Sequence, residues 1–284
     1  MQKFKNTFRY LLPAVILIAL FTSCSLSPAL FFNHHRSSDQ KFTKIGHRGA
    51  RGLAPENTLS AIAEGLKDKA DRIEIDVHQT KDGKVVVMHD AKVDRTTNGH
   101  GLIKNYTYTD LSALDAGSWF DKKFANEKVP TLDETIKFIH GQADLIIEIK
   151  RGDDYYPNII ENILKIIKDN NAGSWCIIHS FYTDVLAKVH VLEPSIRLHK
   201  LFVCKIKFLP VLVGKGFEIY NFNKYSYISE YSLNYHFANK GIIKRIKSKG
   251  KKVNVWVLND QRIINNLISI GVDGIITDFP DRLK

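Results

Sequence analysis

Short apolar runs alternate with amphipathic helical patterns along most of this chain, and this alternation constrains the fold more than any other feature. Strand-like runs of valine, isoleucine and aromatic residues between helices predict a parallel sheet. For a single domain over residues 41–284, the simplest such arrangement is an α/β TIM (β/α)8 barrel. Nine strands are predicted for eight barrel positions, so one is misassigned or lies outside the barrel: Thr43–His47, Arg72–Val77, Val85–His89, Leu145–Ile149, Cys176–His179, Ile196–Phe202, Tyr225–Ser229, Val253–Leu258 and Gly274–Thr277.

Helices are predicted between these strands by apolar residues at helical spacing. Asn57 is a candidate N-cap for the first helix, and Thr131 with Glu134 forms a capping box. Pro157 lies in the first turn of another helix, a position that proline favours. The predicted helices are Asn57–Lys67, Thr131–His140, Pro157–Lys168, Phe237–Lys249 and Asp260–Ile270.

Two segments depart from the simple strand–helix repeat. The connection from Asp76 to Val85 is too short for a regular helix. Residues 91–130 are rich in asparagine, glycine, threonine, aspartate and tyrosine, which predicts a small inserted loop region.

The N-terminal residues 1–32 resemble a targeting segment. Basic residues precede an apolar run from Leu11 to Phe21, as in a signal peptide. The following Phe21-Thr22-Ser23-Cys24 resembles a bacterial lipoprotein signal with Cys24 as the lipidated residue. Alternatively, the 23 uncharged residues from Tyr10 to Phe32 are long enough for an uncleaved membrane anchor, or the protein is simply secreted. All three readings place the domain outside the cytoplasm, and the lipoprotein and anchor readings also tether it to a membrane. Residues 33–40 are predicted to form a linker.

The formal net charge of +11 favours anionic partners, which include phosphodiesters and lipid surfaces. Nucleic acid is not predicted as a partner, because no nucleic-acid-binding motif and no dense basic run occurs. Cys176 and Cys204 lie in apolar runs and are predicted to be buried, with a disulfide between them left open. No cysteine spacing indicates zinc, and no feature indicates an oligomeric state.

Charged residues occur at the ends of the first four predicted strands, where barrel enzymes carry their catalytic groups. Glu74 and Asp76 are two apart on one strand and therefore share a face, and Glu148 comes from another strand. Three converging carboxylates repel each other unless a cation lies between them. All-oxygen ligands suit Mg²⁺ or Ca²⁺ rather than zinc. Taken singly, each carboxylate has the alternative role of a structural salt bridge.

Two histidines and two basic residues lie beside these carboxylates. His47 and His89 have side chains suited to proton transfer near neutral pH, although a single histidine at a strand end often has a structural role. Arg48 and Lys150 are candidates to hold a phosphoryl oxygen, or else they balance the charge of the carboxylates.

A series of motifs runs through residues 43–282 and resembles the glycerophosphodiester phosphodiesterase family of the PLC-like phosphodiesterase superfamily. The motifs follow one another in the family's order: His47-Arg48-Gly49, Pro55-Glu56-Asn57-Thr58, Glu74-x-Asp76, Thr80-x-Asp82-Gly83, His89-Asp90, Asp94-Arg95-Thr96-Thr97-Asn98-Gly99, Val129-Pro130-Thr131-Leu132, Glu148-x-Lys150, Val255-Trp256-Val257-Leu258-Asn259 and the run from Gly271 to Pro280.

The resemblance implies a TIM barrel and hydrolysis of glycerophosphodiesters to glycerol 3-phosphate and an alcohol such as choline or ethanolamine. It implies that His47 and His89 are the acid/base pair. It implies that Glu74, Asp76 and Glu148 are the ligands of one Ca²⁺ or Mg²⁺ ion, and that Arg48 and Lys150 bind the phosphate. It further implies that Glu56 and Asn57 support the first loop, with a direct site role open for Glu56. Trp256 either walls the substrate pocket or belongs to the core. Which histidine is the base, and whether water or a glycerol hydroxyl attacks, stay open.

The chain departs from the family pattern mainly between about residues 200 and 250. Trp256-Val257-Leu258-Asn259 stands where Trp-Thr-Val-Asn is usual, and Leu201 to Asn223 is apolar and basic. That segment is either ordinary barrel structure or a surface facing a membrane or an acyl chain. The alternatives to a soluble diester substrate are therefore a lysophospholipase D or phospholipase activity on a lipid and, in another class, an inactive binding lipoprotein.

Overall fold

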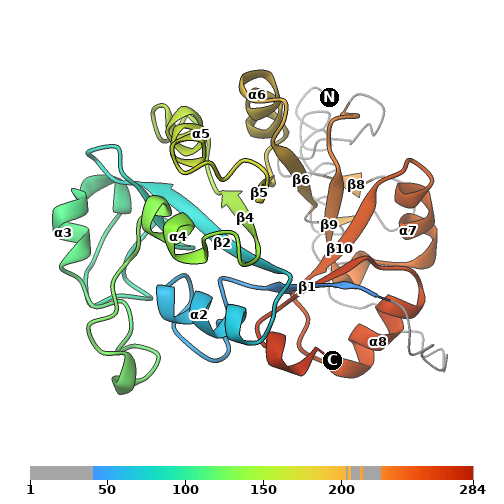
Figure 1. Cartoon of the computed structure of the whole chain (residues 1–284), viewed down its shortest axis with the longest axis horizontal. Coiled ribbons are helices and arrows are strands. Elements are labelled where there is room, and N and C mark those ends of the chain that lie inside the picture. Colours follow the sequence, from blue (N-terminus) through green and yellow to red (C-terminus); the bar gives the residue numbers. More distant parts are fainter. Residues whose placement is uncertain (1–40, 203, 206–211, 214–224, 284) are drawn as a thin grey trace, which may run out of the picture.

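The computed structural model describes residues 41–202, 204–205, 212–213 and 225–283, and these residues form a closed parallel barrel (Figure 1). Strand β1 pairs with both β11 and β2, which closes the ring. The barrel strands are β1 (Thr43–Gly46), β2 (Arg72–Gln79), β4 (Asp144–Ile149), β5 (Cys176–Ser180), β6 (Arg197–Phe202), β9 (Glu230–Asn234), β10 (Lys252–Trp256) and β11 (Gly274–Thr277). The TIM barrel expected from the sequence is therefore confirmed.

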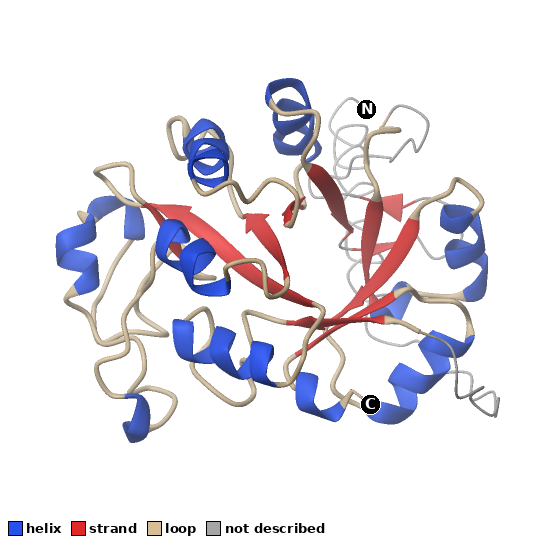
Figure 2. Cartoon of the chain, viewed as in Figure 1, coloured by secondary structure: helices blue, strands red, loops and turns tan. Residues whose placement is uncertain are grey.

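Helices lie around the outside of the strands (Figure 2). Outward-facing strand residues, such as Ile73, Ile75 and Val77, are fully buried. They pack against the apolar faces of these helices and form one large core with them. The helices are α2 (Leu59–Lys67), α4 (Leu132–Ile139), α5 (Ile159–Asp169), α6 (Thr183–Leu192), α7 (Lys240–Lys247) and α8 (Gln261–Ser269), and short 3₁₀ turns η3 (Tyr235–Phe237) and η4 (Pro280–Arg282) accompany them.

The capping box predicted at Thr131 and Glu134 is present at the start of α4. The N-cap predicted at Asn57 is wrong, because Thr58 caps α2 by accepting a hydrogen bond from the backbone N–H of Ala61. Asn57 instead has a φ of 60° and turns its side chain toward the barrel mouth, where it bonds Asp76. The helix that was expected to begin at Phe237 begins at Lys240, capped by Asn239.

One of the nine predicted strands, Val85–His89, lies outside the barrel. β3 (Val85–Val87) pairs antiparallel with the end of β2, because Thr80 to Lys84 forms a tight turn with Gly83 at a φ of 80°. The segment after β3 contains η1 (Ile103–Asn105), α3 (Tyr108–Ser112) and η2 (Lys122–Phe124). It has a small apolar core of its own, formed by Val86, Met88, Val93, Ile103, Leu111, Ala116 and Val129. The inserted region expected at residues 91–130 thus corresponds to a separately packed lobe.

The strand predicted at Tyr225–Ser229 is wrong, because the barrel strand is Glu230–Asn234 and the residues before it form a turn. The aromatic residues that suggested a strand pack outside the barrel, whereas Glu230 binds Arg72 on the opposite side of the barrel interior. Because Glu230 is charged and points inward, the apolar pattern of the sequence did not reveal this strand.

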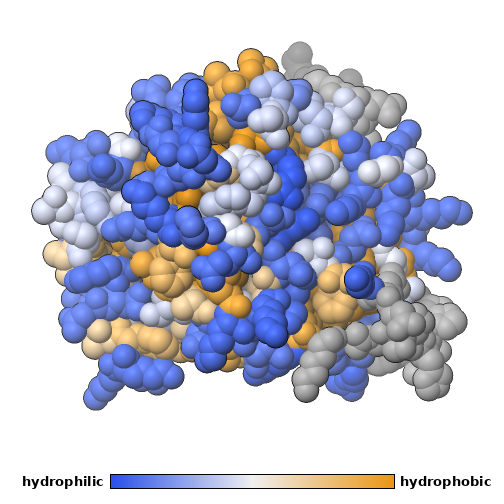
Figure 3. Space-filling model, in the orientation of Figure 1, coloured by the Kyte–Doolittle hydropathy of each residue, from blue (hydrophilic) through white to orange (hydrophobic). Residues whose placement is uncertain are grey.

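Several sequence predictions fall on residues outside the described ranges. They are the signal, anchor and linker at residues 1–40, with Cys24, and most of the 201–223 segment, of which β7 (Cys204–Lys205) and β8 (Leu212–Val213) form a short antiparallel pair. Cys176 is buried, as expected, with a free thiol. Across the described ranges, no helix has both the length and the apolar character needed to cross a bilayer. Hydrophilic residues cover much of the face seen in Figure 3, with smaller apolar patches between them.

Candidate active site

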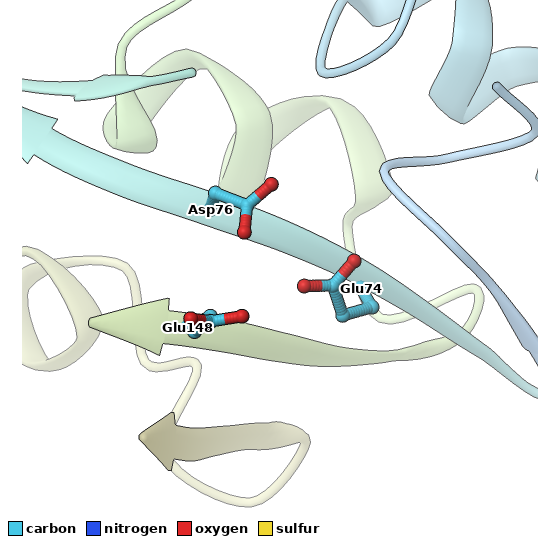
Figure 4. A group of neighbouring side chains, drawn as sticks. All are labelled: Glu74, Asp76 and Glu148. Atoms are coloured by element: carbon cyan, nitrogen blue, oxygen red, sulfur yellow. The ribbon is translucent and has the colours of Figure 1, made fainter. Parts of the chain in front are cut away.

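Three buried carboxylates meet at the mouth of the barrel. Glu74 and Asp76 project from β2 and Glu148 from the adjacent β4, where Asp76 and Glu148 are register partners (Figure 4). One carboxylate oxygen of each lies within 4.8 Å of those of the other two. This confirms the convergence that the sequence predicted and gives an all-oxygen ligand set of the kind that Mg²⁺ or Ca²⁺ prefers.

The electrostatics of this cluster favour a bound cation. Burial raises the pKa of Glu74 well above its ordinary value, and repulsion by Asp76 and Glu148 raises it further. Burial likewise raises the pKa of Glu148 to about 7, although Lys150 opposes the shift. Such groups give up their protons readily only when positive charge is placed beside them, so the donor set fits a divalent cation.

Arg48 and Lys150 already contact the acidic cluster. Lys150 Nζ lies 3.2 Å from Asp76 Oδ1 and 3.0 Å from Glu148 Oε1. Arg48 Nε lies 3.3 Å from Asp76 Oδ2, while its backbone N–H donates to Glu74 Oε2 at 2.9 Å. Burial would raise the pKa of Asp76, but these two cations outweigh it and hold that pKa below its ordinary value. Both basic residues therefore balance the carboxylates, which was one of their two predicted roles.

The loop after β1 is fixed by its backbone. Arg48 has a φ of 52°, a conformation seldom adopted by residues other than glycine and often found at functional sites. Gly49 follows with a φ of 84°, and a Cβ atom there would lie 2.5 Å from the backbone carbon of Ala61 in α2. The His47-Arg48-Gly49 motif thus packs the loop against α2 and directs the Arg48 N–H at Glu74.

His47 is oriented by an aspartate from the other end of the chain. Its Nδ1 lies 2.7 Å from Asp278 Oδ1, just after β11, so Nε2 is the ring nitrogen that this contact does not occupy. Asn259 Nδ2 donates to the second oxygen of Asp278 at 2.9 Å, and Arg51 Nε lies 3.3 Å from the first. Burial lowers the pKa of His47, and the hydrogen bond to Asp278 partly restores it. A neutral imidazole held in one orientation is suited to proton transfer.

His89 has a corresponding partner. Its Nδ1 lies 2.6 Å from Asp90 Oδ1, and Arg95 donates to the other oxygen of Asp90 at 2.7 Å. Burial also lowers the pKa of His89, while the charge of Asp76 opposes that shift. The backbone carbonyl of His89 contacts the ring of His78 at 3.0 Å.

Glu56 and Asn57 join the first loop to the rest of the site. Glu56 accepts hydrogen bonds from Arg48 at 2.7 Å and from two nitrogens of Arg95, which belongs to the inserted lobe. Asn57 Nδ2 donates to Asp76 Oδ2 at 2.8 Å, and its own oxygen accepts from the backbone N–H of Asp76. Glu56 thus ties the lobe to the barrel, and Asn57 fixes the orientation of one carboxylate of the cluster.

Comparisons with known proteins agree on one family. Residues 47–282 match the model of the glycerophosphoryl diester phosphodiesterase family. A glycerophosphodiester phosphodiesterase of Caldanaerobacter subterraneus is 37% identical over 240 residues, which cover 84% of this chain and 95% of that protein.

The chain belongs to the glycerophosphoryl diester phosphodiesterase family.

Solved structures support the same assignment. The glycerophosphodiester phosphodiesterase of Agrobacterium tumefaciens has a TM-score of 0.70 and 29% identity, and the match covers 84% of this chain and 97% of that one. A phosphodiesterase of Oleispira antarctica, solved with the product sn-glycerol-3-phosphate, has a TM-score of 0.75 and 26% identity, covering 85% and 94%. The resemblance drawn from the sequence motifs is therefore confirmed.

Trp256, the remaining predicted site residue, is half-buried at the end of β10. Its ring packs against the inner apolar cluster of Ile45, Ile146, Ile177 and Ile276 and meets Phe181 edge-on at 5.8 Å. These contacts place Trp256 in the barrel core, one of its two predicted roles, and its role as a wall of the substrate pocket stays a prediction.

Sequence reasoning assigned no role to five residues that hold the site together. They are His78, Asp90, Arg95, Asn259 and Asp278. Four of them lie within the family motifs, so the motifs carried the signal. Asp278 is 231 residues from His47, and only the closure of the barrel between β1 and β11 brings the two together.

Proposed function

We propose that this protein hydrolyses glycerophosphodiesters to glycerol 3-phosphate and an alcohol, with a divalent cation and two histidines. The observation that carries the proposal is the acidic cluster of Glu74, Asp76 and Glu148, flanked by His47 and His89, each with an aspartate on Nδ1. Membership of the family and the likeness to a phosphodiesterase solved with sn-glycerol-3-phosphate support it.

Glu74, Asp76 and Glu148 would hold the cation. Once bound, Ca²⁺ or Mg²⁺ supplies positive charge that stabilises a phosphoryl oxygen as negative charge develops on it. Asn57 holds Asp76 and the Arg48 N–H holds Glu74, so two of the three ligands are oriented in advance. Lys150 and Arg48 add fixed positive charge beside the phosphoryl group.

The two histidines divide the proton transfers. One accepts the proton of the nucleophile, either water or a neighbouring glycerol hydroxyl, while the oxygen of the nucleophile bonds to phosphorus. Attack by the hydroxyl would first give a cyclic phosphate, which water then opens to glycerol 3-phosphate. The other donates a proton to the alcohol oxygen as the phosphorus–oxygen bond breaks. In both residues the aspartate on Nδ1 holds the ring so that Nε2 is the reactive nitrogen. Each such group typically contributes about 10²–10⁴-fold to the rate.

The proposed activity is tested by comparing soluble and lipid diesters. Purified full-length protein is given glycerophosphoinositol, glycerophosphocholine or lysophosphatidylcholine, and glycerol 3-phosphate and choline are quantified. Release of glycerol 3-phosphate from a soluble diester supports the proposal. Choline release from the lysophospholipid alone would favour a lysophospholipase D instead, and no release from any of them would favour a binding role.

We further propose that Cys24 carries a lipid that tethers the exported domain to a membrane. The basic residues, the apolar run and the Ser23-Cys24 junction support this reading. In cells, the wild-type protein should incorporate a labelled fatty acid and be shortened to a chain that begins at Cys24, and Cys24→Ala should abolish both. If the wild-type protein stays in the membrane fraction at full length without the label, residues 1–32 act as an uncleaved anchor.

A further inference from the structure

An open cleft of about 550 Å³ extends from the active site between the inserted lobe and the loop after β4. His78, His89 and Lys150 line its inner end. Lys92 and Leu102 of the lobe and Arg151 and Tyr155 of the loop also line it. A volume of this size is typical of ligand-binding pockets and exceeds what a glycerol moiety fills.

The cleft has a positive charge that the catalytic site does not use. Among the described residues, neither Lys92 nor Arg151 forms an ion pair with a carboxylate, and Arg151 donates only to the hydroxyl of Tyr182 at 3.0 Å. Lys150 is already paired with Asp76 and Glu148. The single acidic residue lining the cleft, Asp90, is bonded to both His89 and Arg95.

Tyr155 would be the natural aromatic contact for a cationic alcohol such as choline, because quaternary ammonium groups bind over aromatic faces. Its ring already carries two cations. Lys104 Nζ lies 4.2 Å from the ring centroid, and the Arg151 guanidinium lies 4.9 Å from it. A third cation beside these two would be repelled, whereas an anion would be attracted to both.

We propose that this cleft, which we call the alcohol cleft, receives the alcohol part of the diester and favours alcohols that carry a further anionic group, a phosphate or a carboxylate. The inference rests on the proposed function and specifies its substrate class. The anionic group would lie between Lys92 and Arg151, while the scissile phosphate stays beside His89. Because neither Lys92 nor Arg151 is paired with a carboxylate of the acidic cluster, they would select the substrate without altering the chemistry.

Three soluble substrates that differ in the charge of the alcohol test this inference. They are glycerophosphoinositol 4-phosphate, glycerophosphoinositol and glycerophosphocholine, with glycerol 3-phosphate release as the common readout. For the full-length protein we expect kcat/KM to be at least about tenfold higher for the phosphorylated inositol than for the unphosphorylated one, and lowest for choline. Added salt should reduce this difference, because the cleft is open to solvent.

Neutralising the cleft cations should remove the preference selectively. Lys92→Gln and Arg151→Gln should each lower kcat/KM for the phosphorylated substrate about fivefold, as expected for the loss of one nearby charge, and leave glycerophosphoinositol unchanged. Lys168→Gln is the matched control. It removes the same charge from an exposed position in the last turn of α5, and Lys168 does not line the cleft.

The outcomes separate this inference from the proposed function. Glycerol 3-phosphate release without a preference for the anionic alcohol would overturn the alcohol cleft while supporting the reaction. Equal losses in the two cleft variants with every substrate would also overturn it. No release of glycerol 3-phosphate from any of the three would refute the proposed function and the inference with it.

Discussion

Replacing Asp278 with asparagine tests whether the aspartate on Nδ1 positions His47 for catalysis. The two side chains are 2.7 Å apart and only 12% and 15% exposed. A hydrogen bond with a charged partner contributes about 1.5–3 kcal/mol of stabilisation. We expect Asp278 to give most of this stabilisation to His47 when the ring is an imidazolium. Asp278→Asn should therefore lower kcat about 10–150-fold, with little change in KM.

The same substitution should shift the pH–rate profile in a direction that does not depend on which histidine is the base. Burial lowers the pKa of His47, and Asp278 opposes this shift. Removing the negative charge of Asp278 lowers that pKa further, so the imidazole loses its proton at a lower pH. The limb of the profile that reports His47 moves toward acid, whether it is the acidic limb of a base or the alkaline limb of an acid.

The assay is glycerol 3-phosphate release between pH 5 and 9, with thermal unfolding as a check on folding. Asp281→Asn is the control, because it makes the same chemical change at an exposed position three residues away. Wild-type turnover in Asp278→Asn, or an unmoved profile, would refute the positioning role. An equal loss in the control would assign the effect to general disturbance of the C-terminal segment.

Three further predictions follow from the site and its surroundings. His89→Ala should lower kcat about 10²–10⁴-fold with unchanged thermal unfolding, and normal turnover would exclude His89 from proton transfer. Glu148→Gln should weaken Ca²⁺ or Mg²⁺ binding at least about tenfold by calorimetry, since one of three carboxylate ligands is lost, and an unchanged affinity would remove it from the ligand set. Burial lowers the pKa of His179 and of His199, so below about pH 6.5 the unfolded chain binds protons that the folded protein does not. Urea unfolding should then show stability falling from pH 7 to 5, by up to about 1.4 kcal/mol per pH unit for each histidine. His199→Gln should flatten this slope, and an identical slope would contradict the assignment.

The barrel was predictable from the sequence because strands buried on both faces read as short apolar runs. The chemistry was predictable for the opposite reason. Glu74, Asp76 and Glu148 interrupt such runs, and a buried carboxylate requires a partner. The same rule holds at Glu230, which the sequence did not single out, because its inward charge pairs with Arg72 across the barrel and has a structural role. A single sequence does not distinguish a buried charge that binds a ligand from one that binds another strand.

Contacts between distant segments were the part that the sequence could not supply. The pairing of His47 with Asp278 depends on barrel closure, and the pairing of Glu56 with Arg95 depends on how the lobe folds back. The direction of β3 was left open, because Val85 to Val87 has the composition of a barrel strand although its connection from Asp76 is too short for a helix. Its direction is set by the short Thr80–Lys84 connection, which leaves no room for a crossover helix.

Chelation and reconstitution test whether the protein is a cation-dependent phosphodiesterase centred on Glu74, Asp76 and Glu148. Purified full-length protein is treated with EDTA, dialysed, and assayed for glycerol 3-phosphate release from glycerophosphoinositol as Mg²⁺ or Ca²⁺ is added back. Activity should be lost on chelation and restored to saturation by one of these cations. Full activity in the metal-free protein would show that the reaction does not depend on a cation at this cluster.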